Sequence, residues 1–140
     1  MIVLDTNVVS EVLRSRPDPQ VASWLESLTG DVAITAVTLA ELLAGVRRLP
    51  AGRRSRALAA RIDAAIEPYL SDRSVLAFDH VAAVQYADVL AARESAGLPI
   101  AMADAQIAAI CRARNATCAT RNTKDFAHTG IDVVDPWTDI

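Results

Sequence analysis

The start of this chain constrains its fold most, because an apolar run is followed at once by polar residues. Residues 2–4 (Ile-Val-Leu) form a run typical of a strand that is buried on both faces of a sheet. Asp5, Thr6 and Asn7 follow, and apolar residues then recur at helical spacing over 8–13. A strand that leads into a helix in this way places Asp5 at the carboxyl-terminal edge of a parallel sheet. Open α/β sheets bind their ligands at that edge.

The rest of the chain alternates between strand and helix patterns. After residues 2–4, strands are predicted over 32–35, 75–78, 116–119 and 131–134. Helices are predicted over 8–13, 21–28, 38–46, 57–66, 81–90 and 103–112. Asp79 is the predicted N-cap of the helix at 81–90, and residues 97–99 form a break. Strands separated by helices indicate right-handed crossovers. We therefore predict an α/β three-layer sandwich, with a central parallel sheet of about five strands flanked by helices, as a single domain over residues 1–140.

The composition narrows the class of protein. The chain is 52% hydrophobic and 22% charged, which is globular and argues against disorder of the whole chain. Its net charge of −3 argues against a broadly basic nucleic-acid binder. No segment reaches the roughly 18 apolar residues of a membrane span, and two cysteines are too few for a disulfide scaffold. We expect a soluble cytoplasmic protein in which Cys111 and Cys118 are buried thiols.

Four carboxylates stand at corresponding positions of the predicted sheet. Asp5 ends the first strand, Glu41 lies near the start of the helix after the second, Asp104 near the start of a later helix, and Asp125 follows the fourth strand. Because all four positions fall at one sheet edge, the charges would repel each other unless a cation lay between them. Hard oxygen ligands of this kind suit Mg²⁺ or Mn²⁺. Such a site activates water for attack on a phosphodiester.

Each of these acids also has a purely structural explanation. Asp5 can cap the following helix, and Thr38-x-x-Glu41 fits a capping box. Asp104 can match a helix dipole, and Asp125 can stabilise a turn. All four structural explanations would have to hold at places that converge, and Asp104 has apolar neighbours that make an unpaired carboxylate costly. The set therefore favours a metal site.

Polar residues that follow the first and fourth strands would support these acids. They are Thr6, Asn7, Thr120 and Asn122. Hydroxyl and amide groups can orient a carboxylate or a metal-bound water. Turn and capping chemistry is the alternative explanation for each of them.

The pattern of these motifs resembles the PIN-domain family and, within it, the VapC-type ribonuclease toxins of bacterial type II toxin–antitoxin systems. The resemblance spans the chain and is carried by residues 2–7, Thr35 with 41–45, 98–99 with 104–108, 120–126 and the closing 133–137. It implies a PIN-like fold and a Mg²⁺-dependent endoribonuclease, with Mn²⁺ as a substitute. Asp5 and Asp104 would be the main metal ligands, Glu41 would act directly or through water, and Asp125 would be the fourth acid.

The same resemblance implies partners. These are an RNA substrate, a homodimer and a cognate antitoxin whose carboxyl-terminal segment covers the site. The apolar first helices are our candidate for the dimer face. An arginine-rich stretch offers two interpretations, namely a solvated helical hairpin or a positive rim that contacts RNA or the antitoxin. It comprises Arg47, Arg48, Arg53, Arg54, Arg56 and Arg61.

The remaining charged and aromatic residues receive structural interpretations. Arg93, Arg112 and Arg114 are predicted at the surface, and His80 and His128 as surface or capping residues. Trp24 and Trp137 are predicted to fill core or subunit contacts. Arg14 and Arg16, near the end of the first helix, could reach a phosphate.

Two other functions compete with the nuclease. One is a PIN-like domain that binds without catalysis. The other is a receiver-type phosphoacceptor domain, which would use an acidic pair at the first strand, an Asp after the third and a Lys after the last. Asp79 and Lys124 stand at two of those places, but Asp5 has no acidic neighbour. This departure disfavours the receiver hypothesis.

Overall fold

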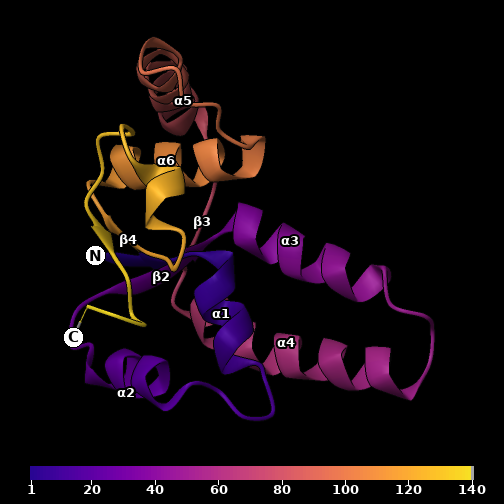
Figure 1. Cartoon of the computed structure of the whole chain (residues 1–140). Coiled ribbons are helices and arrows are strands. Elements are labelled where there is room, and N and C mark those ends of the chain that lie inside the picture. Colours follow the sequence, from indigo (N-terminus) through magenta and orange to yellow (C-terminus); the bar gives the residue numbers. More distant parts are fainter. Residues whose placement is uncertain (140) are drawn as a thin grey trace.

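The fold is built on a five-stranded parallel sheet, seen in a computed structural model that describes residues 1–139. The strand order is β3-β2-β1-β4-β5, so the first strand is central (Figure 1). The strands are β1 (Ile2–Leu4), β2 (Val32–Thr35), β3 (Val75–Leu76), β4 (Thr117–Ala119) and β5 (Val133–Val134). The predicted parallel sheet of about five strands is confirmed.

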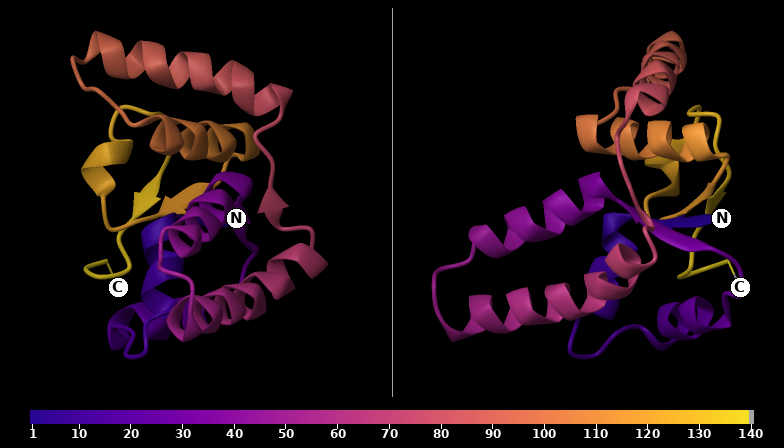
Figure 2. Two further views of the ribbon diagram at one scale, coloured as in Figure 1. Left: turned by 90° about the vertical axis from the view of Figure 1, so that its right-hand side faces the viewer. Right: turned by 180° about the vertical axis from the view of Figure 1, so that it is seen from behind.

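Helices cover both faces of this sheet, which confirms the three-layer α/β sandwich (Figure 1). They are α1 (Thr6–Val12), α2 (Pro19–Ser27), α3 (Ala36–Arg47), α4 (Arg53–Ser71), α5 (His80–Ser95) and α6 (Met102–Arg114), with a short 3₁₀ helix η1 (Thr123–Phe126). The α3–α4 hairpin projects away from the sheet (Figure 2). Among residues 1–139, no helix is both long enough and apolar enough to cross a membrane.

The central strands are buried on both sides because successive side chains point to opposite faces. Val3 and Cys118 belong to the core cluster beneath α5 and α6. Leu4 and Ala119, the next residues, belong to the cluster that also holds the buried residues of α1, α2 and α4. Short apolar runs are therefore sufficient to form the strands of this sheet. Because the strands are parallel, their last residues all lie at the same edge.

The start of α3 differs from the prediction. The helix begins at Ala36 rather than Thr38, and the Thr35 hydroxyl is its cap, accepting from the Thr38 backbone N–H at 3.0 Å. The predicted capping box of Thr38 and Glu41 is therefore wrong. Thr35 ends a buried strand and already supplies the capping oxygen, so Thr38 is left inside the first turn, fully buried.

The boundaries of other elements also differ from the predicted ones. α4 extends well beyond the predicted 57–66 at both ends. At its start, Ser55 bonds to both backbone groups of Gly52 and fixes the first turn. The predicted strand at 75–78 ends at Leu76, and Phe78 instead packs edge-on against Tyr86 with ring centroids 5.8 Å apart. The predicted strands at 116–119 and 131–134 begin at Thr117 and Val133.

Candidate active site at the acidic edge of the sheet

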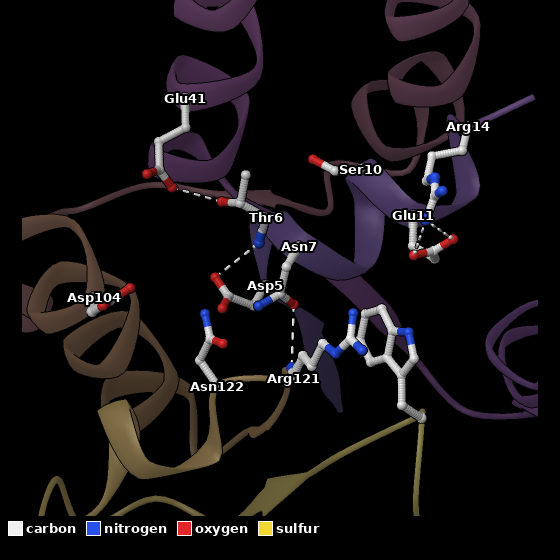
Figure 3. Close-up of a pocket in the computed structure, with 11 residues that line it drawn as sticks. Asp5, Thr6, Asn7, Ser10, Glu11, Arg14, Glu41, Asp104, Arg121 and Asn122 are labelled. Carbon is white, nitrogen blue, oxygen red and sulfur yellow. Dashed lines mark hydrogen bonds and ion pairs between the residues drawn. The ribbon is translucent and has the colours of Figure 1, made fainter. Parts of the chain in front are cut away.

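A pocket of about 510 Å³ opens where the strands end. Three of the four predicted acids, Asp5, Glu41 and Asp104, line it (Figure 3). Each comes from a different element, namely the end of β1, the second turn of α3 and the first turn of α6. The remaining lining residues are Thr6, Asn7, Ser10, Glu11, Arg14, Arg121, Asn122 and Trp137.

Asp5 is the most constrained of the acids. Its side chain is only 5% exposed and serves as the N-cap of α1, accepting from the Thr6 backbone N–H at 2.8 Å. Its second carboxylate oxygen accepts from the Thr120 hydroxyl at 2.7 Å. These donors favour the charged form, but burial outweighs them and, with the charges of Glu41 and Asp125, raises the pKa of Asp5. The structural capping role and a place in the acidic pocket therefore coexist in this residue.

The Glu41 side chain hydrogen-bonds to a residue of α1 rather than to one of its own helix, α3. Its carboxylate accepts a 2.6 Å hydrogen bond from the Thr6 hydroxyl, which also lies 3.1 Å from the hydroxyl oxygen of Thr38. The side chain is exposed to the pocket. This hydrogen bond across two elements aims Glu41 at the end of β1.

Asp104 differs from both, because its carboxylate makes no hydrogen bond to any residue in 1–139 (Figure 3). It is half-buried at the start of α6. Burial, followed by the charges of Asp5, Asp125 and Glu41, raises the pKa of Asp104 to about 6, while Arg93 opposes this shift. The charges of the other three acids thus all act on Asp104.

Asp125 lies beside the pocket rather than in its lining. It is part of η1, where its backbone N–H donates to the Asn122 carbonyl at 3.0 Å. Its charge nevertheless contributes to the raised pKa of both Asp5 and Asp104. The 3₁₀ helix therefore places Asp125 at the margin of the acidic group.

The predicted polar residues meet at the Thr120 hydroxyl. This fully buried side chain donates to Asp5 and accepts from the Asn7 amide at 3.2 Å and the Asn122 backbone N–H at 3.1 Å. Thr6, Asn7 and Asn122 line the pocket themselves. One hydroxyl thus ties the ends of β1 and β4 together beneath the acids.

Arg93 was predicted at the surface, and the structure shows that prediction to be wrong. Its side chain is 4% exposed and donates only to backbone carbonyls. Two of these, Leu98 and Pro99, precede α6, and two, Lys124 and Ala127, belong to the η1 segment. The guanidinium therefore joins the loop before Asp104 to the turn that carries Asp125. No sequence pattern indicates this role, because an arginine in an amphipathic helix normally faces water.

Several lining residues were not predicted as part of the site. Glu11 is 6% exposed and forms an ion pair of 3.3 Å with Arg14. The Cζ atom of Arg121 lies 5.0 Å from the centroid of the Trp137 ring. The i, i+3 spacing of Glu11 and Arg14 could have indicated their pairing. The contact between Arg121 and Trp137 joins segments that are distant in the sequence, so no local sequence pattern predicts it.

The arginine-rich stretch lies away from the acids. Arg47 and Arg48 end α3, Arg53 and Arg54 begin α4, and all four stand at the outer end of the projecting hairpin (Figure 2). None of these four belongs to the residues that line the acidic pocket. A role in contacting RNA or an antitoxin stays a prediction. Arg61 instead donates to the Leu13 carbonyl at 3.0 Å.

The donor chemistry of the pocket fits a hard divalent cation. The two ion pairs formed within residues 1–139 join Arg14 to Glu11 and Arg112 to Asp88, so the four predicted acids have no cationic partner there. No three His, Cys, Asp or Glu side chains in this part of the chain approach closely enough to form a complete metal cage. Mg²⁺ ordinarily uses one or two carboxylates and keeps several waters, so a complete cage is not required.

Comparisons with known proteins identify the family of this chain. The PIN domain model matches residues 2–132. Toxin FitB of Neisseria gonorrhoeae is 41% identical over 140 residues, covering 99% of this chain and 100% of that protein. VapC ribonuclease Y4jK of Sinorhizobium fredii is 39% identical over 138 residues, covering 98% of each. The crystal structure of FitAcB from Neisseria gonorrhoeae contains a chain with a TM-score of 0.90 and 40% identity, covering 99% of both chains.

Proposed function

Because this chain belongs to the PIN-domain family, we propose that it is a metal-dependent endoribonuclease that acts as the toxin of a type II toxin–antitoxin pair. The observation that carries the proposal is the group of acids at the edge of the sheet, three of which line one pocket and none of which has a cationic partner within residues 1–139. The charges of the other three help to raise the pKa of Asp104. Unpaired carboxylates at such positions are unfavourable unless the site binds cations. The names of the relatives, a toxin and a VapC ribonuclease, give the same reaction class and biological role.

Asp5 and Asp104 would hold the metal, Mg²⁺ or in its place Mn²⁺. When bound, such an ion activates water and neutralises charge on a phosphodiester. Glu41 would contact the ion directly or through water, and Asp125 would add negative charge at the margin. Asp5 cannot turn away, because Thr6 and Thr120 each bond one of its oxygens. Asp104 carries no such restraint and can adjust to the ion.

The partners follow from the same proposal. A related structure is that of FitAB bound to a DNA fragment, and one of its chains is 39% identical to this one. We infer a cognate antitoxin that covers the acidic pocket, a homodimer and a cytoplasmic location. The pocket opens beside a neighbouring groove between α1, α3 and α4, which shares Thr6, Arg14 and Glu41 with it. A protein segment lying along this groove would reach the acids directly.

Cleavage of total cellular RNA by purified, antitoxin-free protein tests the proposal. We expect discrete fragments with Mg²⁺ or Mn²⁺, none with EDTA, and at least a hundredfold loss of rate for Asp104→Asn. Asp63→Asn, an exposed acid on α4, is the matched control and should cleave as wild type does. Equal cleavage with EDTA, or by Asp104→Asn, would contradict the metal-site assignment.

The binding-only alternative makes a different prediction in the same assay. A domain without catalysis would bind Mn²⁺ and RNA but produce no fragments under any condition. The receiver alternative has lost its support, because the Asp79 carboxylate caps α5 by accepting from the Ala82 backbone N–H at 3.0 Å and is not part of the acidic pocket.

A further inference from the structure

The acidic pocket has a second end of different chemistry. Arg121, on the loop after β4, and Trp137, near the end of the chain, line the same pocket as the acids. The guanidinium lies over the indole ring, with its Cζ atom 5.0 Å from the ring centroid (Figure 3). Arg121 is exposed and Trp137 is half-buried. Although carboxylates are near, the Arg121 guanidinium contacts an aromatic face instead of forming an ion pair within residues 1–139.

Both residues are fixed through their backbones. The Arg121 N–H donates to the Asn7 side-chain oxygen at 3.3 Å, and the Asn7 amide in turn donates to Thr120 beside Asp5. The Trp137 N–H donates to the Asp135 carboxylate at 2.8 Å, and its carbonyl accepts from the Gln20 amide on α2 at 2.6 Å. The backbones that carry the ring and the guanidinium are therefore tied to the acidic end of the pocket and to α2, and the two side chains contact each other.

We propose that Arg121 and Trp137 form a stacking platform for one base of single-stranded RNA, adjacent to the phosphodiester at the acids. This inference rests on the proposed function and identifies where that substrate is held. Proteins that bind single strands combine aromatic rings with arginine, because every nucleobase presents a π-face that stacks on both. A strand whose phosphodiester lies at the acids of one end would bring a neighbouring base to the other end of the same pocket.

The charges in the pocket favour a base at this end. Arg14 and Arg121 are the cationic side chains of the lining, and Arg14 is already paired with Glu11. One unpaired guanidinium against several carboxylates provides little attraction for a phosphate chain without metal. Stacking on the indole and the guanidinium does not depend on that charge balance. The platform therefore supplies affinity that the acids cannot.

Tryptophan fluorescence gives a direct test. Trp24→Phe leaves Trp137 as the single tryptophan of the two in the chain. This protein is titrated with a mixed-sequence oligoribonucleotide of about 12 nucleotides and with a matched oligomer of abasic residues, in Ca²⁺, a hard cation bound by oxygen ligands. We expect saturable quenching by the first oligomer and at least tenfold weaker binding of the second, which lacks bases to stack.

Variants separate stacking from a structural role of the indole. With labelled RNA and fluorescence anisotropy, Trp137→Ala should bind the base-containing oligomer about tenfold more weakly, and Trp137→Phe should restore most of that loss. If Trp137→Ala instead disrupted the structure of the chain end, the binding of both oligomers would weaken equally. Equal affinity for the two oligomers in wild type, equal weakening of both by Trp137→Ala, or quenching that occurs only with an antitoxin would each overturn the platform. Metal-dependent cleavage by the same protein would leave the proposed nuclease function standing.

Discussion

The two sides of the acidic pocket hold carboxylates in opposite ways. On the β1 side, the carboxylates of Asp5 and Glu41 accept short hydrogen bonds from Thr6 and Thr120. On the α6 side, Asp104 has no hydrogen-bond partner within residues 1–139, and its pKa rises to about 6. One side is therefore prearranged, and the other carries an acid whose carboxylate has no partner among residues 1–139.

The support behind each side also differs. Side-chain hydroxyls and amides link β1, α1, α3 and the end of β4 directly. On the α6 side, a single buried residue, Arg93, bonds to four backbone carbonyls of the two loops that flank Asp104 and Asp125. The backbone on that side is fixed while its acidic side chains stay free. The comparison indicates that the carboxylates on the β1 side are held rigidly, where they would orient a metal. The carboxylates on the α6 side stay free to move, where they would complete its coordination.

The largest change in stability is expected when Arg93, which supports the loops on the α6 side, is replaced. Arg93→Gln leaves several buried carbonyls without donors, so we expect a loss of about 3 kcal/mol in the free energy of unfolding, measured by urea denaturation. Arg114→Gln, at the exposed end of the same region, should change stability by less than about 0.5 kcal/mol. Equal losses in both variants would show that the carbonyls are satisfied in another way.

A smaller loss is expected on the β1 side. Thr120→Val removes the donor to Asp5 and the acceptor for Asn7 and Asn122, which should cost about 1–2 kcal/mol at pH 8. Thr117→Val, at the start of the β4 strand that Thr120 follows, is the matched control, because its hydroxyl makes no side-chain hydrogen bond within residues 1–139. A Thr120→Val protein as stable as this control would mean that the hydroxyl does not hold Asp5.

Removing the unpaired charge of Asp104 should stabilise the metal-free protein, whereas the two substitutions above destabilise it. The folded pKa of Asp104, about 6, lies above its unfolded value of 3.8, so metal-free protein loses stability as the pH rises between these two values and carries the full penalty above about pH 6. The shift would correspond to roughly 3 kcal/mol for a buried acid, which solvent access reduces to about 1 kcal/mol. Asp104→Asn should therefore be more stable than wild type at pH 8 and equal to it at pH 4, by thermal denaturation in EDTA.

Adding metal should reverse that order. Mn²⁺ should raise the melting temperature of wild type at pH 8 and raise that of Asp104→Asn much less, because binding to the folded state alone is stabilising. The same increase in both proteins would remove Asp104 from the metal site.

The smallest effect is expected for Glu41→Gln. The amide oxygen can still accept the Thr6 hydrogen bond, and the side chain is exposed, so stability should stay within about 0.5 kcal/mol of wild type. Mn²⁺ affinity should nevertheless fall, because a ligand charge is lost. A stability loss as large as that of Thr120→Val would place Glu41 among the rigid elements of the site.

Sequence patterns predicted the fold well where burial is local. The runs at 2–4 and 32–35 are apolar because both sheet faces are covered, and they gave their strands with the observed boundaries. The short edge strands β3 and β5 were overextended, since part of each apolar run packs outside the sheet. The start of α3 was misplaced because Thr35 and Thr38 are both good caps by type, and only the strand before them decides between the two.

The acids of the site were predictable because a parallel sheet brings the ends of its strands together. The residues behind them were not. Arg93 looks like a surface arginine until the loop that follows its helix and the distant η1 segment supply carbonyls around it. Arg121 meets Trp137 across 16 positions of the chain. Contacts of this kind depend on tertiary packing, for which periodicity and spacing carry no information.

The most direct test of the central claim is proton release when Mn²⁺ binds metal-free protein, measured by titration calorimetry in two buffers of different ionisation enthalpy. Metal ligands must be deprotonated, so at pH 6 binding should release about half a proton from Asp104, and at pH 8 almost none. In Asp104→Asn, Mn²⁺ should bind at least tenfold more weakly. Absence of Mn²⁺ binding, or proton release that is the same at both pH values, would contradict a cation site completed by Asp104.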